Sequence, residues 1–389
     1  MSARFHVADE TAIAAGATTD VYFARTLELL AREGVDPDVV VEVRARTLPD
    51  GWPWAMFAGV EEAAELLPAG LAVRAIAEGA LFQAGEPVLG IEGRYREFAA
   101  LETPLLGLLC QASGIATAAA RCRVAAGERA LLSFGARRMH PAIAPMIERS
   151  AWLGGCDGVS TIAAAELLGI EPTGTMPHAL VLCLGDTVRA ARAFDAAFGG
   201  ETPTIVLIDT FQDEKFEALA VAEALGERLH GVRFDTPGSR RGNMVEILEE
   251  TRWELDLRGH RGVRFYVSGG LDPEAILELN PVCDGYGVGT HISAARTIDF
   301  SLDIVEIDGR PIAKRGRASG RKALLLCGSC GGRSIVPAAR EVDPIPCPAC
   351  GAAVRDALQP LPRPYPPVAG LREVARGSLS GLTLDSPLA

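Results

Sequence analysis

Residues 133–180 combine arginines, glycines and a histidine in two segments, each of which reads as a strand followed by a helix. Arg137 and Arg138 end the first strand, and His178 precedes a later apolar run. A planar guanidinium group can bind two oxygens of a phosphate or carboxylate at once. Glycine lets backbone N–H groups approach an anion. The segment therefore predicts a site for a phosphorylated sugar.

Two further glycine-rich endings, SGGLD at residues 268–272 and GVGTH at residues 287–291, follow consecutive apolar strands. Backbone N–H groups exposed by glycine, followed by the N-terminus of a helix, bind phosphate without charged side chains. Each ending alone is more often an ordinary turn. As a pair on neighbouring strands, they favour a phosphate site.

Asp209 and Asp235 each precede a threonine at the end of a strand, and Arg233 lies two residues before Asp235. Carboxylates there could bind ribose hydroxyls, hold Mg²⁺ against a pyrophosphate or stabilise positive charge on a sugar ring. The alternatives are a helix cap for each aspartate and a structural ion pair for the arginines. Asp213 and Glu214 are expected to cap the next helix.

The histidines and Tyr22 indicate less about function from sequence alone. A lone histidine is most often structural, so composition alone assigns no role to His178 or His140. Tyr22 lies on an otherwise apolar helical pattern and would by default belong to the core.

The cysteines fall into two groups. Cys327 and Cys330 form one CxxC word, and Cys347 and Cys350 form another after 16 intervening residues. Four thiolates at this spacing can converge tetrahedrally on zinc, so we expect a closed, structural Zn²⁺ site rather than a redox pair. The remaining five are expected to be reduced, small core residues, namely Cys110, Cys122, Cys156, Cys183 and Cys283.

Composition excludes several classes of protein. The chain has 389 residues, of which 48% are hydrophobic, so we expect two or three folded domains. A net charge of −12 disfavours a nucleic-acid binder. We expect no apolar run of the roughly 20 residues needed to span a bilayer, and the first residues lack the pattern of a signal peptide. A cytoplasmic protein with no nucleic-acid or membrane partner is expected.

Apolar periodicity predicts an α+β domain first and a β/α alternation after it. Asp20 is placed to cap a helix through Arg32, strands are expected at residues 39–45, 71–79 and 87–95, and a helix at residues 101–119. Seven strands of a parallel sheet or barrel then follow, ALLSFGAR, DGVSTI, the ALVL after His178, TIVLIDT, GVRFDT, RFYVSGG and YGVGT. Their carboxyl ends would converge on one mouth.

Several sequence words together resemble the nicotinate phosphoribosyltransferase family. They are FGARR, GGCDGVS and GTMPHAL, with TTDVYF, GEPVLGIEGRY, LETPLLGLL and KRGRASGRK, and they extend over most of residues 15–322. The resemblance implies an α/β type II phosphoribosyltransferase fold, in which an α+β sandwich domain packs on an incomplete seven-stranded α/β barrel. A cysteine-rich C-terminal module is typical of the shorter, archaeal-like branch.

The implied domains are a sandwich domain at residues 1–115, completed by strands within 298–322, and a barrel at residues 116–297. A zinc ribbon with a proline-rich tail occupies residues 323–389. The family forms homodimers or higher homo-oligomers whose active sites are shared between subunits.

The resemblance also implies roles for individual residues. Tyr22 of a partner subunit would stack on the pyridine ring, while Arg137 and Arg138 bind its carboxylate or the phosphates. The implied catalytic residues are His178, Asp209 and Asp235, and the other implied substrate-binding residues are Thr175, Arg233, Gly269, Gly270, Gly289 and Thr290. His178 matches a histidine that ATP-coupled members phosphorylate transiently. The chain reads RFDTPGS where many members read RxDSGD, and GTMPH for GTxAH, so ATP coupling stays open.

The implied reaction joins nicotinate to 5-phosphoribosyl 1-pyrophosphate with Mg²⁺, giving nicotinate mononucleotide and pyrophosphate in NAD biosynthesis. Such catalysis is mainly positioning and electrostatics. One alternative is a decarboxylating quinolinate phosphoribosyltransferase, which needs additional cations for a second carboxylate. The other is a non-catalytic nucleotide-binding protein whose zinc ribbon docks a partner.

Overall fold

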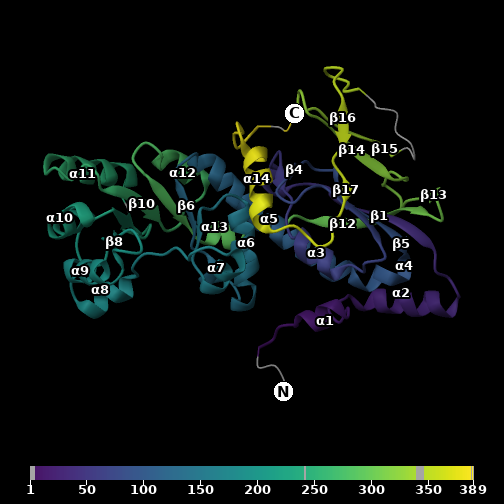
Figure 1. Ribbon diagram of the computed structural model, residues 1–389, viewed down its shortest axis with the longest axis horizontal. Coiled ribbons are helices and arrows are strands. Elements are labelled where there is room, and N and C mark those ends of the chain that lie inside the picture. The colour runs from purple at the N-terminus through teal and green to yellow at the C-terminus, as the bar shows by residue number, and fades with distance from the viewer. Residues whose placement is uncertain (1–4, 241, 339–345, 387, 389) are drawn as a thin grey trace. The chain divides into compact units, whose positions relative to one another are not determined.

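The computed structural model describes residues 5–240, 242–338, 346–386 and 388 (Figure 1). The chain forms two compact units, one made of Met1–Thr117 with Arg296–Ala389 and the other of Ala118–Ala295. The fold is mixed α/β, with one curled parallel sheet and separate antiparallel sheets.

A six-stranded antiparallel sheet is the centre of the first unit, in the order β13-β12-β1-β5-β3-β17. Its strand β1 is rich in valine, and the alternate residues Val39, Val41 and Val43 are almost completely buried. Phe300 of β12 packs against Phe57 and Phe82, with ring centroids 6.0 and 5.5 Å away. The strands are β13 (Arg310–Pro311), β12 (Phe300–Ile307), β1 (Asp38–Ala45), β5 (Pro87–Arg94), β3 (Ala72–Ala75) and β17 (Gln359–Pro360).

The strands expected at 39–45 and 87–95 are confirmed, whereas the one expected at 71–79 is only four residues long. β12 pairs antiparallel with β1, so the chain returns to this sheet after completing the second unit. Of the strands expected within residues 298–322, β12 is eight residues long, whereas β13 has only two, Arg310–Pro311.

Helices and a two-stranded antiparallel sheet, β2-β4, complete the first unit. The 25-residue helix α5 begins in this unit and continues past its boundary at Thr117. The hydroxyl groups of Ser113 and Thr117 on α5 accept hydrogen bonds from the backbone N–H groups of Ala58 and Met56. The elements are α1 (Glu10–Ala14), α2 (Val21–Arg32), β2 (Ala55–Met56), α3 (Val60–Leu66), β4 (Leu81–Phe82), α4 (Tyr95–Phe98), α5 (Glu102–Ala126) and α14 (Val368–Leu379).

Asp20 occupies the N-cap position of α2 as predicted, but its carboxylate does not bond the helix. It instead accepts a hydrogen bond from the hydroxyl of Thr103, at 3.0 Å. The cap residue therefore joins the start of α2 to the start of α5.

The sequence prediction that no run is apolar enough to span a membrane is wrong. Residues 95–126 include a stretch long and apolar enough to do so, with a mean hydropathy of 1.3. Because 72% of that stretch is buried within the protein, it is the core helix of a soluble fold rather than a clear membrane span.

The cysteine module contains a three-stranded antiparallel sheet, β15-β14-β16. Arg333 donates to both carboxylate oxygens of Glu86, at 2.7 and 2.6 Å, and both side chains are largely buried. Lys322 donates to Glu42 at 2.9 Å. These ion pairs anchor the module to the first unit's sheet. Its strands are β14 (Lys322–Cys327), β15 (Arg333–Pro337) and β16 (Val354–Asp356).

The second unit is built on a six-stranded parallel sheet in the order β7-β6-β11-β10-β9-β8. The strands are β6 (Ala130–Ser133), β7 (Gly158–Val159), β8 (Ile205–Leu207), β9 (Gly231–Phe234), β10 (Arg264–Ser268) and β11 (Gly285–Val288). The helices are α6 (Ala144–Leu153), α7 (Ile162–Leu168), α8 (His178–Leu184), α9 (Thr187–Phe198), α10 (Glu214–Leu225), α11 (Met244–Leu257), α12 (Pro273–Leu279) and α13 (Thr290–Ser293).

One of the seven predicted barrel strands is wrong, because ALVL belongs to α8. Pro177 precedes this helix in an extended conformation, and Gly185 ends it with a φ of 77°. A short apolar run does not distinguish a strand from a helix, so these flanking residues decide. The described sheet consequently has six strands, with β7 and β8 at its two edges.

Four of the five unpatterned cysteines are buried or half-buried, but Cys183 on α8 is exposed and does not belong to the core. Its apolar neighbours predicted burial, but of the residues of α8 only Val181 is buried.

Glu102, at the start of α5, gives the first unit a pH-dependent stability. Burial raises the pKa of its carboxyl to about 7, and Asp303 adds to the increase while Lys314 opposes it. The unfolded chain releases this proton near pH 4.5, so ionisation in the folded protein lowers stability as the pH rises through 7.

We predict that Glu102→Gln raises the melting temperature at pH 8, by an amount that corresponds to roughly 1–2 kcal/mol after allowance for solvent screening. The gain is smaller at pH 5, where Glu102 keeps its proton. Thermal unfolding at both pH values measures this difference, with Glu97→Gln, a change of an exposed side chain on α4, as the matched control. Equal gains at the two pH values would refute the assignment.

Candidate functional site

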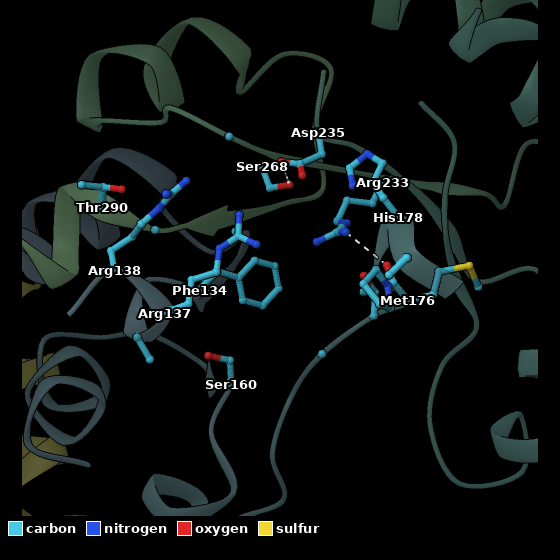
Figure 2. Close-up of a pocket in the computed structure, with 18 of the residues that line it drawn as sticks. Phe134, Arg137, Arg138, Ser160, Met176, His178, Arg233, Asp235, Ser268 and Thr290 are labelled. Atoms are coloured by element: carbon cyan, nitrogen blue, oxygen red, sulfur yellow. Dashed lines mark hydrogen bonds between the residues drawn. The ribbon is translucent and has the colours of Figure 1, made fainter. Parts of the chain in front are cut away.

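A pocket of about 550 Å³ lies at the carboxyl ends of the second unit's parallel strands (Figure 2). It brings together residues that follow β6, β7, β9, β10 and β11. Those predicted from sequence are Arg137, Arg138, Thr175, His178, Arg233, Asp235, Gly269, Gly270, Gly289 and Thr290. The pocket is open to solvent and mixes polar with apolar walls.

Arg137 and Arg138 lie on a short 3-10 turn, Ala136–Arg138, directly after β6. The turn requires a glycine before it, because the backbone at Gly135 passes close to the neighbouring loop. A Cβ at Gly135 would lie 2.5 Å from the carbonyl oxygen of Gly289. In Figure 2, Arg138 and Thr290 lie on one side of the pocket, and His178 and Met176 lie on the other.

Arg233, on β9, is held within the pocket wall. Its Nη2 atom donates to the carbonyl of Met176 at 3.2 Å, and its guanidinium carbon lies 5.9 Å from the ring centroid of Phe134. The Nε atom is buried without a protein partner. Burial lowers the pKa of Arg233, and Asp235 and Asp209 oppose that decrease. Arg233 is therefore a partly desolvated cation with a free donor.

Asp235 follows β9, and the register of the sheet places it beside Ser268 of β10. The Ser268 hydroxyl donates to Asp235 Oδ1 at 2.7 Å (Figure 2). Because Ser268 is itself buried, it fixes the orientation of the carboxylate.

His178 begins α8, and its Nε2 atom lies 3.1 Å from Oδ1 of Asp209. Asp209 lies behind the histidine and does not line the pocket, and its Oδ2 is buried without a protein partner. Burial raises the pKa of the Asp209 carboxyl, the charge of His178 and its hydrogen bond lower it, and Asp235 raises it further. The pair therefore resembles the histidine–carboxylate arrangement that orients an imidazole ring.

The two glycine-rich endings meet on adjacent strands, because β10 pairs parallel with β11. Gly269 and Gly270 have φ values of 89° and 68°, which L side chains rarely adopt. Gly289 precedes the single turn of α13, which starts at Thr290. Backbone N–H groups near such turns suit a phosphate group.

Sequence reasoning missed several pocket residues. Phe134 and Met176 contact Arg233, while Ser160 and Thr161 form a hydroxyl-bearing wall after β7. Apolar or small residues of this kind form no sequence motif that predicts a binding site. They are recognised as pocket residues only once the fold is known.

Besides Asp209, two other residues singled out from sequence, Tyr22 and His140, do not line the pocket. Tyr22 is on α2 of the first unit, with 56% of its surface exposed. It is therefore not the core residue that the apolar pattern predicts by default. His140 accepts a hydrogen bond through Nδ1 from the backbone of Ala142, at 3.2 Å, and so has the structural role of a cap.

The four patterned cysteines converge. Their Sγ atoms all lie within 4.8 Å of one another. Cys327 and Cys350 are 3.5 Å apart, as are Cys330 and Cys347. Hydrogen bonds from the backbone of Cys330 and Ser329 lower the pKa of Cys327 to about 6. A hydrogen bond from the backbone of Gly332 lowers the pKa of Cys330, but its hydrogen bonds with the other three thiols outweigh that effect and raise this pKa to about 12.

Comparisons with known proteins agree with this geometry. The family model for the N-terminal domain of quinolinate phosphoribosyl transferase matches residues 20–113, and the model for its C-terminal domain matches residues 115–303. A nicotinate phosphoribosyltransferase of Mycobacterium tuberculosis is 34% identical over 341 residues, which cover 77% of this chain and 75% of the relative.

Two solved structures have the same fold. The nicotinate-nucleotide pyrophosphorylase of Pyrococcus furiosus has a TM-score of 0.93 and 49% identity, over 96% of this chain and 97% of that chain. Human nicotinic acid phosphoribosyltransferase has a TM-score of 0.73 over 95% of this chain and 96% of that chain, and at 24% identity it supports the fold alone. By the extent of its match to the Mycobacterium tuberculosis relative, the chain belongs to the nicotinate phosphoribosyltransferase family.

Proposed function

We propose that this protein is an enzyme that transfers the phosphoribosyl group of 5-phosphoribosyl 1-pyrophosphate to nicotinate. The products are nicotinate mononucleotide and pyrophosphate, in a step of NAD biosynthesis. One observation carries the proposal, namely the pocket in which three arginines face an oriented aspartate and two glycine-rich strand ends. The names of the curated relatives agree with it.

The 5′-phosphate binds at the two glycine-rich endings, where Gly269, Gly270, Gly289 and Thr290 offer backbone N–H groups. Arg137, Arg138 and Arg233 bind the remaining anions, which are the pyrophosphate and the carboxylate of the base. Thr175 adds a hydroxyl that is buried without a protein partner. The substrates are thus held at a fixed separation, which is the main source of catalysis in such transfers.

Bond cleavage at C1 of the ribose leaves positive charge on the sugar ring. Asp235, held by Ser268, lies where its carboxylate can stabilise that charge. The ring nitrogen of nicotinate then forms the new bond to C1 as pyrophosphate leaves. This route requires no activated nucleophile from the protein.

Mg²⁺ fits the oxygen-rich chemistry of this pocket. When bound, it neutralises charge on the departing pyrophosphate. Asp235 offers a carboxylate oxygen towards the pocket, and Asp209 has a buried oxygen without a protein partner. Asp209 orients His178, which stays the candidate for phosphorylation should ATP be coupled to the transfer.

Quinolinate is the second candidate substrate, because both family models bear the name of the quinolinate enzyme. Its two carboxylates need more positive charge than nicotinate does. Within the described pocket, the permanent cations are the three arginines, which the phosphates also require. The nicotinate reaction is therefore the better fit.

The active site is completed by a second subunit in this proposal. Tyr22 is exposed on α2, where it can stack on the pyridine ring in the pocket of a partner chain. A homodimer, or a higher homo-oligomer built from it, follows. We further propose a cytoplasmic location without a nucleic-acid partner, which the net charge of −12 disfavours.

The C-terminal cysteines hold Zn²⁺ as a structural ion in this proposal. A tetrahedral site with Zn–S bonds of about 2.3 Å separates its sulfur atoms by about 3.8 Å. The observed sulfur separations of 3.5 Å for two pairs are close to that value. We accordingly divide the chain into a sandwich domain at 1–115 with strands from 298–322, a barrel at 116–297 and a zinc ribbon at 323–389.

We predict that purified protein with phosphoribosyl pyrophosphate and Mg²⁺ forms mononucleotide from nicotinate, and not from quinolinate or nicotinamide. Mass spectrometry of parallel reactions, with and without ATP, measures the product and its dependence on ATP. If only quinolinate gave product, the protein would instead be a decarboxylating quinolinate phosphoribosyltransferase.

Asp235→Asn is expected to lower kcat at least about tenfold with the fold intact, because the neutral amide no longer stabilises the cationic sugar. Asp299→Asn, on an exposed residue outside the pocket, serves as the matched control. Steady-state kinetics and a thermal melt measure activity and folding together. Wild-type kinetics in the Asp235 variant would remove this residue from the site.

We expect about one zinc ion per chain by elemental analysis, and Cys347→Ser should lose it with a lower melting temperature because one ligand is missing. Cys183→Ser, which changes an exposed cysteine outside the cluster, should keep both the zinc ion and the wild-type melting temperature. A protein that contains no zinc when purified from zinc-supplemented cells would contradict the assignment.

A further inference from the structure

Glu148 is a fully buried carboxylate on α6 that no step of the proposed reaction uses. Its Oε1 accepts from the backbone N–H and the hydroxyl of Ser160, at 2.9 and 2.6 Å. Its Oε2 accepts from the backbone N–H and the hydroxyl of Thr161, at 2.8 and 2.5 Å. Two consecutive residues of the pocket wall are thus fixed by one side chain.

These hydrogen bonds determine what the wall can offer to a ligand. A hydroxyl group has a single hydrogen, and a carboxylate can only accept. Ser160 and Thr161 therefore direct both hydroxyl hydrogens at Glu148, and only oxygen lone pairs remain for the pocket. Their backbone N–H groups point to the same carboxylate, so they are also occupied.

We propose that Glu148 is a positioning residue that makes this wall a hydrogen-bond acceptor only, and that the wall thereby excludes a second carboxylate on the pyridine ring. The inference rests on the proposed function and adds a reason why the enzyme would use nicotinate rather than quinolinate. A carboxylate placed against Ser160 and Thr161 meets no donor and loses its hydration, which is costly in a partly buried site.

The number of cations is consistent with this selection. The permanent cations of the described pocket are Arg137, Arg138 and Arg233. The arginines of the described pocket can accept one carboxylate together with the phosphates, and the Glu148 wall leaves the second carboxylate of a dicarboxylate base unpaired.

Glu148→Gln tests the proposal because it preserves shape and changes polarity. The amide nitrogen now donates to one hydroxyl, which turns its hydrogen towards the pocket. Two constants are measured, the KM for nicotinate and the inhibition constant of quinolinate as a competitor of nicotinate. Glu166→Gln, on an exposed residue of α7, is the matched control.

We expect the ratio of the quinolinate inhibition constant to the nicotinate KM to fall at least about tenfold in Glu148→Gln and to stay unchanged in Glu166→Gln. A purely structural role would weaken both ligands in parallel and leave the ratio as it is, which would overturn the proposal.

If Glu148→Gln fails to fold, the double variant Ser160→Ala/Thr161→Val decides instead. It removes both hydroxyl oxygens, and with them the repulsion between their lone pairs and a carboxylate, while Glu148 keeps its two backbone donors. The ratio is expected to fall, by less than in Glu148→Gln because the double variant gains no donor. An unchanged ratio in the folded double variant overturns the inference. Failure of the proposed function is distinct, since the wild-type protein would then form no mononucleotide from nicotinate, and the inference would fail with it.

Discussion

Parallel hydrogen bonding between β10 and its two neighbours is the constraint on which the pocket depends. Val267 is paired with Phe234 of β9 and with Tyr286 of β11, so the residues that follow these strands emerge at one edge. A slip of one residue would turn alternate side chains to the other face of the sheet. The contact between Ser268 and Asp235 is a direct result of this register.

The same convergence brings charged side chains into a partly buried site, which costs free energy of solvation. Burial lowers the pKa of Arg233 and raises that of Asp209, so each group is less stable as an ion than it is in water. Their opposite charges offset part of this cost, and a bound anion would offset more. A pocket of this kind is stabilised by its ligand, which links substrate binding to the stability of the second unit.

The predictable features are those that local sequence patterns encode. The strand ends at Asp235 and Gly269 were recognisable because polar or glycine-rich words follow apolar runs. The sequence predicts a strand where the helix that starts at His178 lies. Its apolar run is too short to define a period, so tertiary packing decides its conformation. Glu148 could not be found from sequence, because its partners lie on a different element and nothing in an amphipathic helix marks one buried carboxylate.

The return of β12 to the first unit's sheet has a consequence for synthesis on the ribosome. β1 is flanked by β5 and β12, but β12 emerges only after the whole of the second unit. Until then, one edge of a valine-rich strand is unpaired, and such edges invite pairing with other chains. The second unit is continuous in sequence and can fold in the meantime as an inserted domain. The nascent first unit therefore has the longer exposure to misassembly, and chaperones would be needed most during that interval.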